Sequence, residues 1–583
     1  MIILGLSPTA HESAVGILVD GRLVAAASEE RFSRVKNQGG FPTRALEFCL
    51  KRAGIEAKDV DHVAYAALPF QKERLRDVVN YGQNLRYVST AGGSAKSRLF
   101  HLANYARALA VHSSWLTGKN EELIRGELQH FGLDQKLVFV DHHLSHCAAA
   151  YFTSGFERTL VVSLDGYGSG NAGSFYLGEG GKLTLLSPIP YPHSLGTFYR
   201  RVTQALGFKP NRHEGKIVGL AAFGDPSKLY DRVRARFNLE HDDYFRFTSA
   251  QDPFFEKELV AKYSREDIAA AYQRVLEDVA VHYVKKWLAR TGATRVACAG
   301  GVFANVKMNQ RIMEIDGVEK MFVFPAMSDA GVGVGAAYAL SSDLGKLTPE
   351  PIADVYLGPS YSDAEIEKAL RASGLSFWKS ANAVDEIVDR LVKNKVVARF
   401  GGAMEFGPRA LGNRSILYPA LEPEVNKWLN DRLKRTEFMP FAPISLAERA
   451  SDLYVNIDRV MHSAEFMTVT TDCTPRMRAE SPAAVHVDGT ARPQLVRADR
   501  NPTVHAILKR YEERTKIPTL INTSFNMHEE PIVCSPDDAI RAFKDGNLEV
   551  LSLGDYLVES TTSAADGKRP GGRSAEATGH AAS

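Results

Sequence analysis

The sequence has few cysteines, and their arrangement fits neither a disulfide framework nor a zinc ribbon. The 583 residues include five cysteines, which are odd in number, far apart and without a CxxC pair. A zinc ribbon needs closely spaced thiols, and disulfide-rich secreted proteins use even sets of cysteines. The composition therefore argues against both classes and predicts a cytoplasmic protein.

Long hydrophobic runs and an excess of one charge are also missing. No apolar run approaches the roughly 18 residues of a membrane-spanning helix, and MIILGLSP lacks the basic start of a signal peptide. Lysine and arginine total 71 and aspartate and glutamate 69, so the formal net charge is only +2. We therefore expect a small-molecule substrate, and neither nucleic acid nor membrane as a partner.

The length requires more than one domain. A single hydrophobic core stops growing at about 250 to 300 residues, and this chain has 583. Residues 341–360 are rich in proline, glycine and serine, which is typical of a junction. We predict an N-terminal domain at 1–345, a C-terminal domain at 346–559 and a disordered tail at 560–583, which has few bulky apolar side chains.

A strand followed by a hairpin occurs twice in the N-terminal half. Residues 2–6 form an apolar run, and residues 13–28 form two runs joined by Asp20-Gly21, a strong hairpin turn. The pattern returns at 159–164 and, after Asp165-Gly166, at 171–187. Such a repeat is typical of the two-lobed α/β fold of actin, hsp70 and sugar kinases, in which a nucleotide lies between the lobes. We therefore expect Asp165 and Gly166 to contact nucleotide.

Three histidines follow an apolar strand in VFVDHHLSHCAAAYF. The alanines after them favour a helix, on which His142 and His146 lie one turn apart on one face. That spacing lets two imidazoles bind one metal ion. A third ligand must come from elsewhere, and Asp329, at a glycine-rich helix start, is the candidate.

Two glycine-rich stretches, EGKIVGLAAFG and ACAGGVFANVKMN, have glycines where a backbone can approach a ligand closely. In the second, a strand leads through two glycines into a helix, whose first amides can bind phosphate. The expected nucleotide contacts from these stretches are Glu214, Lys216, Gly219, Gly300, Gly301 and Asn305.

The C-terminal half is organised around AMEFGPRALGNRS at 403–415. Gly407 and Gly412 free the backbone so that Arg409 and Arg414 can be aimed, and a pair of guanidiniums suits a polyanion. Lys434-Arg435, HVDGTAR and NTSFN follow and fit the same pocket. The expected ligand contacts are Arg409, Arg414, Lys434, Arg435, His486, Arg492, Asn522, Ser524 and Asn526.

Taken in this order, HHLSH, EGKIVGLAAFG, MEFGPRALGNRS, HVDGTAR and NTSFN resemble the O-carbamoyltransferase family of antibiotic and nodulation-factor biosynthesis, a branch of secondary metabolism. The resemblance covers residues 1 to about 558. It implies an ATPase-fold N-terminal domain and an α+β C-terminal domain like the threonylcarbamoyl-adenylate synthase.

The resemblance also implies a mechanism. The C-terminal domain would make carbamoyl-adenylate from carbamoyl phosphate and ATP with Mg2+, and the N-terminal cleft would transfer the carbamoyl group to a hydroxyl of a small molecule, leaving AMP. The metal at His142, His146 and Asp329 would be Fe2+ or another divalent ion. His11 stands where the family has a histidine and could accept the acceptor's proton, and Lys36 could contact the acceptor or the adenylate.

Two departures leave the donor open. Ala403 and Met439 stand where the family usually has arginine, in the half expected to bind carbamoyl phosphate. An amide synthetase that adenylates a carboxylate and acylates an amine is therefore an alternative. A tRNA-modifying fusion is less favoured because of the near-neutral charge, and a non-catalytic nucleotide-binding module does not explain two sets of site motifs.

Overall fold

The computed structural model describes residues 1–7, 11–90, 95–112, 119–247, 255–345, 347–434 and 441–560. The chain forms two compact units. The N-terminal unit comprises Met1–Ala26 and Gly39–Ile352, and the C-terminal unit comprises Ala27–Gln38 and Ala353–Ser583. The sequence predicted one boundary, after residue 345, whereas a short early segment also belongs with the C-terminal unit. The predicted tail, Ser560 apart, lies outside the described residues.

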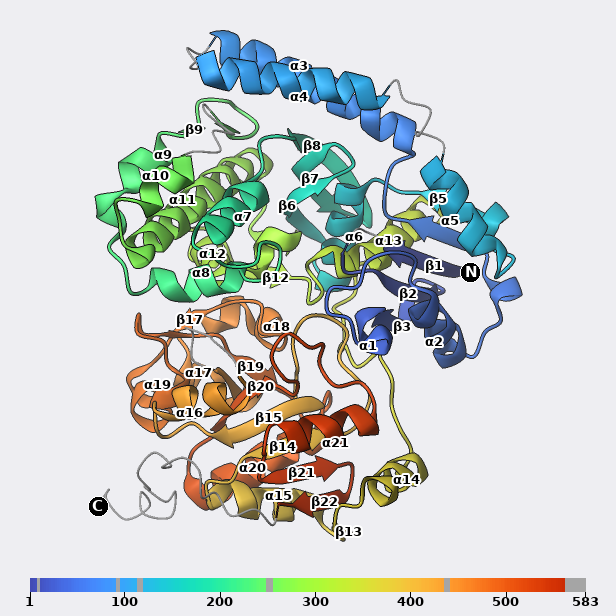
Figure 1. Ribbon diagram of the computed structural model, residues 1–583, viewed down its shortest axis with the longest axis vertical. Coiled ribbons are helices and arrows are strands. Elements are labelled where there is room, and N and C mark those ends of the chain that lie inside the picture. Colours follow the sequence, from blue (N-terminus) through green and yellow to red (C-terminus); the bar gives the residue numbers. More distant parts are fainter. Residues whose placement is uncertain are drawn as a thin grey trace. The chain divides into compact units, whose positions relative to one another are not determined.

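The N-terminal unit contains two sheets of identical topology (Figure 1). The first has the order β3-β2-β1-β4-β5 and the second β8-β7-β6-β11-β12. Their strands are β1 (Ile2–Ser7), β2 (Ala14–Val19), β3 (Arg22–Ser28), β4 (His62–Tyr65), β5 (Leu137–Phe139), β6 (Arg158–Gly168), β7 (Asn171–Glu179), β8 (Lys182–Pro190), β11 (Arg295–Ala299) and β12 (Lys320–Val323). In each sheet the first strand pairs antiparallel with the next strand and parallel with a later one. The duplication confirms the predicted repeat and the two-lobed α/β architecture.

The predicted hairpin turn at Asp20-Gly21 is present, and a turn at Gly180-Gly181 joins β7 to β8. Asp20 and Gly21 have φ of 49° and 77°, and Gly180 and Gly181 have φ of 57° and 75°. Two-residue hairpin turns need positive φ at both positions, which aspartate tolerates and glycine adopts freely. The turn residues therefore fix the register of the strands that lead to the site.

Helices surround these sheets. They include α2 (Thr43–Ala53), α3 (Phe70–Thr90), α4 (Ala95–His112), α5 (Lys119–Gln129), α6 (His142–Ser154), α7 (Leu195–Ala205), α8 (Glu214–Ala221), α9 (Tyr230–Arg234), α10 (Phe255–Val260), α11 (Arg265–Thr291), α12 (Val306–Met313) and α13 (Val332–Leu344). Helices α6 and α13 pack so closely that a Cβ at Gly335 of α13 would overlap the carbonyl oxygen of Ser145 on α6.

The C-terminal unit is built on one mixed sheet of the order β13-β22-β21-β14-β15-β20-β16-β19. Its strands are β13 (Phe377–Lys379), β14 (Val397–Phe400), β15 (Arg414–Pro419), β16 (Ala442–Leu446), β19 (Gln494–Val496), β20 (Thr519–Ser524), β21 (Val550–Leu553) and β22 (Tyr556–Glu559). Its helices include α1 (Glu30–Ser33), α14 (Asp363–Ser373), α15 (Ala383–Val392), α16 (Val425–Arg432), α20 (Pro502–Thr515) and α21 (Pro536–Asp545). A buried aliphatic core joins α15 and α20 to the sheet. A capping box of Ser362 and Glu365 begins α14.

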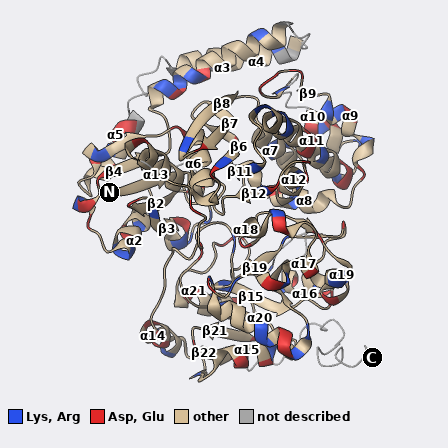
Figure 2. Cartoon of the chain, turned by 180° about the vertical axis from the view of Figure 1, so that it is seen from behind, with Lys and Arg blue, Asp and Glu red and all other residues tan. Residues whose placement is uncertain are grey.

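Charges of both signs are distributed over the helices of each unit (Figure 2). Within the described ranges, no helix combines the length and the hydrophobicity needed to cross a bilayer.

Candidate functional site

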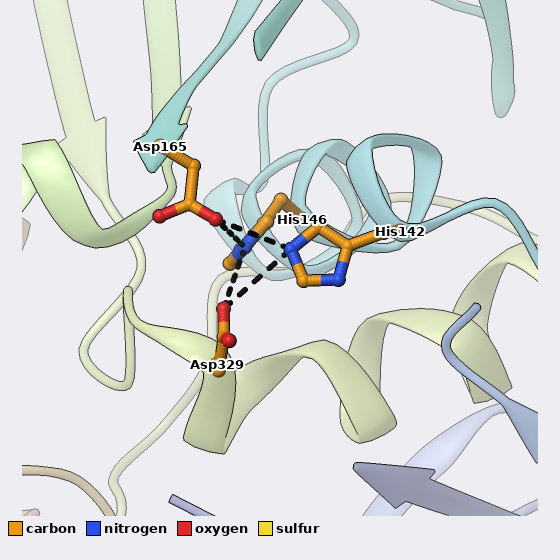
Figure 3. Close-up of side chains that lie close together, drawn as sticks. All are labelled: His142, His146, Asp165 and Asp329. Atoms are coloured by element: carbon orange, nitrogen blue, oxygen red, sulfur yellow. Dashed lines mark hydrogen bonds and ion pairs between the residues drawn. The ribbon is translucent and has the colours of Figure 1, made fainter. Parts of the chain in front are cut away.

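Two histidines and two aspartates meet inside the N-terminal unit (Figure 3). His142 and His146 come from the first turns of α6, Asp165 from β6, and Asp329 from the short turn before α13. His142 Nε2 lies 3.2 Å from Asp165 Oδ2 and 3.5 Å from Asp329 Oδ1, while His146 Nε2 lies 3.8 Å and 3.6 Å from the same atoms. All four side chains converge on one point, with ligand atoms within 4.8 Å of one another.

Local contacts hold each member in place. Asp141 caps α6, since its Oδ1 accepts from the amides of His143 and Leu144 at 2.9 and 3.1 Å. The Ser7 hydroxyl at the end of β1 donates to the Asp329 carbonyl. The amide of Gly301 donates to Asp165 Oδ1 at 3.1 Å. Elements from both sheets thus fix the geometry.

The protonation of the cluster is set by its carboxylates. Burial alone would lower the pKa of His142, but the carboxylates of Asp329 and Asp165 raise it to about 9. Burial alone would raise the pKa of Asp165, but hydrogen bonds from His142 and His146 hold it well below its usual value. His143 differs, since burial lowers its pKa to about 4 while its Nδ1 lies 2.9 Å from Ser163 Oγ. A neutral His143 therefore supports the helix and stands outside the cluster.

The donor set fits a divalent cation. Two anionic carboxylates and two imidazoles, all buried, leave a concentration of negative charge that a divalent ion would neutralise. Nitrogen and oxygen donors suit several first-row ions and do not select one. The cluster includes a fourth side chain, Asp165, for which the sequence predicted a nucleotide contact. Its place beside the histidines was missed because nothing in the sequence shows that the end of β6 faces α6.

The glycine turn after β11 lies directly against this cluster. Gly300 has φ of 104°, and a Cβ there would overlap the Leu164 carbonyl oxygen. A Cβ at Gly301 would lie 2.9 Å from Asp165 Oδ1. Glycine is therefore required at Gly300, whereas a side chain at Gly301 would displace the Asp165 carboxylate. Gly166 is approached equally closely, since a Cβ at Gly196 would lie 2.6 Å from its nitrogen.

The other predicted nucleotide contacts occupy helix starts. Asn305 caps α12 by accepting from the amide of Met308 at 3.0 Å, and its side-chain amide pairs with Gln273 at 2.8 and 3.0 Å. On α8, Lys216 and Gly219 are buried, and Glu214 accepts from the Asn211 amide at 2.7 Å. Burial raises the pKa of Glu214. Asn305 is thus held by protein partners.

The two predicted catalytic residues lie in loops. His11 is half-buried between β1 and β2, and Lys36 is half-buried in the segment 27–38 of the C-terminal unit.

In the C-terminal unit, the loop at 403–415 is organised from inside by opposite charges. Glu405 Oε1 accepts from the amides of Leu411, Asn413 and Arg414 at 2.7, 2.8 and 3.1 Å. Arg414 is fully buried, and its guanidinium lies 3.8 Å above the Phe400 ring. It donates to the carbonyl oxygens of Gly401, Gly402, Asn413 and Pro359. The sequence predicted a ligand contact for Arg414, whereas its donors hold the loop.

NTSFN lies beside this loop. Ser524 pairs with Ser415 across β20 and β15. Asn522 donates to the Ala410 carbonyl oxygen at 3.0 Å and to Gln494 Oε1 at 2.6 Å. Asn526 donates to the carbonyl oxygens of Met527 and Glu530 at 2.7 and 3.0 Å. These amides also shape the loops.

A small pocket contains two of the predicted residues, His486 and Arg492. Its lining includes Ala442, which lies opposite Asn522 in the sheet register. The HVDGTAR turn is ordered by Asp488, whose Oδ1 accepts from the Thr490 amide and hydroxyl at 3.1 and 2.6 Å. Arg409 is half-buried and Lys434 is exposed after α16, while Arg435 and Met439 lie outside the described residues.

Comparison with known proteins assigns the chain to a family. The model of the carbamoyltransferase N-terminus matches residues 2–338, and that of the carbamoyltransferase C-terminus matches residues 388–560. The chain belongs to the carbamoyltransferase family. Nodulation protein NolNO of Sinorhizobium fredii is 31% identical to this carbamoyltransferase over 95% of the chain and 79% of its own length. An uncharacterised protein of Synechocystis is 31% identical over 96% of the chain and 97% of its own length.

Among solved structures, component A of the Acidaminococcus fermentans (R)-2-hydroxyglutaryl-CoA dehydratase covers 59% of this carbamoyltransferase and 98% of its own chain. Its sequence identity is 15% and its TM-score 0.33. At this overlap the likeness adds nothing to the assignment, which follows from the family models and the strand order.

Proposed function

We propose that this carbamoyltransferase is an ATP-dependent O-carbamoyltransferase with two sites. The observation that carries the proposal is the presence of two built sites on one chain. One is a buried group of two imidazoles and two carboxylates, and the other is a pocket lined by His486 and Arg492. The pairing fits activation of a carbamoyl group at one site and its transfer at the other.

In the C-terminal unit, water would first cleave carbamoyl phosphate to carbamate and phosphate. The carbamate oxygen would then attack the α-phosphate of ATP with Mg2+, forming carbamoyl-adenylate and releasing pyrophosphate. Bringing two polyanions together requires cations aimed at both. We assign this role to Arg409 and Arg492, with Lys434 and Arg435 as further cations and His486 and Ser524 as polar contacts. Arg414, Asn522 and Asn526 hold the loops that carry these groups.

In the N-terminal unit, the acceptor hydroxyl would attack the carbamoyl carbon and AMP would leave. His142, His146, Asp165 and Asp329 would hold Fe2+ or another divalent ion, which as a Lewis acid would polarise the adenylate. Gly166, Gly300 and Gly301 let the backbone approach the nucleotide, with Glu214, Lys216, Gly219 and Asn305 around it. His11 would accept the acceptor's proton. Lys36, which belongs to the C-terminal unit, would contact the acceptor or the adenylate.

The acceptor we propose is a hydroxylated small molecule of secondary metabolism, such as an antibiotic precursor. We place the reaction in the cytoplasm, because all five cysteines are free and buried, as expected under reducing conditions.

A second candidate is an amide synthetase on the same scaffold. It is favoured by Ala403, which supplies no cation to the loop of Arg409 where the family usually has arginine. A site with fewer cations would bind the phosphate of carbamoyl phosphate less tightly and would suit a carboxylate substrate, which carries less negative charge.

The test compares carbamoyl phosphate with a panel of carboxylates in an assay of pyrophosphate and AMP release by the purified chain with ATP and Mg2+. If the chain transfers carbamoyl groups, pyrophosphate and AMP should be released with carbamoyl phosphate. With carbamoyl phosphate labelled at its carbon, the adenylate should carry that label. Release with a carboxylate but none with carbamoyl phosphate would refute the proposal in favour of the amide synthetase.

A further inference from the structure

A short segment from the N-terminal part of the chain is built into the C-terminal unit. Residues Ala27–Gln38, between β3 and α2, belong to that unit and contain the single-turn helix α1. Phe32 packs against a buried cluster of Met404, Ala410, Ile532 and Cys534. The segment is therefore part of the hydrophobic structure beneath the 403–415 loop.

Two arginines of this segment hold two different loops. Arg31, only 6% exposed, donates from Nη2 to the Gly407 carbonyl oxygen at 2.8 Å. Arg34 donates to the carbonyl oxygens of Ile532 and Pro531, each at 2.8 Å, and its Nε lies 3.2 Å from Asp538 Oδ1. The first loop carries Arg409, and the second follows NTSFN.

The contact at Gly407 falls where the loop needs external support. Glu405 binds the amides of residues 411, 413 and 414, and Arg414 binds carbonyls at 401, 402, 413 and 359. Gly407 has φ of 119°, which leaves its peptide free of the restraint that a side chain would impose. A charged donor fixed on its carbonyl oxygen orients the peptide that leads through Pro408 into Arg409.

The segment is itself braced. Glu30 accepts from the Asn37 amide at 2.7 Å and lies 3.2 Å from Arg31 Nη1. Arg31 therefore reaches Gly407 from a closed loop, which holds its guanidinium in place.

We infer that Ala27–Gln38 is a clamp that completes the C-terminal site, with Arg31 as a positioning residue that aims Arg409 and Arg34 as its counterpart at the 531–532 loop. Adenylate formation in the C-terminal unit thus depends on residues from the N-terminal part of the chain. This dependence rests on the proposed function, whereas the positioning of the loop does not.

The loop is tested first, by hydrogen–deuterium exchange of the full chain. Arg31→Ala should accelerate exchange in peptides spanning 405–414 and leave α11 unchanged. The control, Arg52→Ala, removes an exposed arginine from the end of α2 and should change neither. Unchanged exchange at 405–414 in Arg31→Ala would overturn the clamp, whatever reaction the enzyme catalyses.

The catalytic consequence is tested by carbamoyl-phosphate-dependent pyrophosphate release. Arg31→Ala should lower kcat/KM on the order of 100-fold, since small misplacements of a binding group have effects of that size. Arg31→Lys keeps a donor and the charge, so its kcat/KM should fall less than that of Arg31→Ala. If the alanine variant does not fold, the kcat/KM of the lysine variant tests the positioning role. In Arg31→Ala/Arg409→Ala, the loss should match that of Arg409→Ala alone, because both changes remove one contact.

The positioning role would be overturned if the loss in the double variant equalled the product of the two single losses. It would also be overturned if the Arg31→Ala variant and the Arg31→Lys variant each kept the kcat/KM of the wild type. If the wild-type chain releases no pyrophosphate with carbamoyl phosphate, the proposed function fails, and the exchange experiment alone decides the clamp.

Discussion

At the scale of single residues, buried charge has two uses in this carbamoyltransferase. In the N-terminal unit, Asp165 and Asp329 face two imidazoles with no guanidinium or ammonium among the four, an arrangement that suits a metal ion. In the C-terminal unit, Glu405 and Arg414 are buried and satisfied by backbone amides and carbonyls, which stabilise a loop. Buried charged side chains therefore form a candidate metal site in one unit and hold a loop in the other.

Asp165→Asn should weaken metal binding by more than the 10- to 100-fold typical of changes outside the ligand shell. The amide keeps the size of the side chain but removes one of the two carboxylate charges. Metal content after dialysis, with titration of Fe2+ and other divalent ions, measures the effect. Asp316→Asn, an exposed change in the same unit, is the control. Equal metal content in both variants would remove Asp165 from the ligand set.

Arg414→Lys should lower the free energy of unfolding by about 3 kcal/mol or more, because an ammonium cannot replace a guanidinium that donates to several buried carbonyls. Urea unfolding at pH 7.5 measures the loss. Arg497→Lys, which changes an exposed ion pair with Asp499, should cost less than about 1 kcal/mol. A similar loss in both would contradict the scaffold role of Arg414.

At the scale of elements, the cluster of two histidines and two aspartates depends on how closely two helices approach. Helix α6 carries the histidines, and Asp329 directly precedes α13, so the spacing of α6 and α13 sets the distance between these side chains. Glycines on α13 permit this approach.

Gly335→Ala should therefore lower both stability, by about 1 to 3 kcal/mol, and metal affinity, because the added methyl overlaps the Ser145 carbonyl oxygen. Gly126→Ala on α5 is a matched control, since nothing lies within 4 Å of its added Cβ. That change should be neutral or stabilising. Thermal unfolding and metal titration of both variants test the comparison, and an unaffected Gly335→Ala would show that α6 and α13 pack less closely.

His193 makes the start of α7 sensitive to acid. Its Nδ1 accepts from the Phe247 amide at 3.1 Å, and burial, with a contribution from Arg246, lowers its pKa to about 3. Below pH 6.5 the unfolded chain binds a proton that the folded chain does not, so stability falls as the pH falls toward 3. The slope from this group is about 1.4 kcal/mol per pH unit.

His193→Gln should flatten this dependence. The free energy of unfolding, measured between pH 7.5 and 5, should decline less steeply in the variant than in the wild type. The same slope in both would show that His193 does not titrate as described.

At the scale of the whole molecule, the sequence predicted what is local. Asp20-Gly21 specified its hairpin, and the spacing of His142 and His146 specified a shared helix face. The family motifs were also recognisable, and the family models confirm the assignment.

Contacts between distant segments were not predictable in this way. The ligand role of Asp165 depends on how β6 lies against α6, and the burial of Arg414 depends on carbonyls more than 50 residues away, such as that of Pro359. The association of Arg31 with Gly407 spans 376 positions of sequence. No periodicity or turn signal reports such pairs, because each segment alone resembles an ordinary loop.

The central claim is that activation and transfer occupy different units of one chain. The most direct measurement is pyrophosphate release from ATP by the full chain with Mg2+ and carbamoyl phosphate, comparing wild type, Asp165→Asn and Arg492→Ala. We predict release by the wild type and by Asp165→Asn, and loss in Arg492→Ala. Release that does not require carbamoyl phosphate, or that is lost equally in both variants, would contradict the assignment.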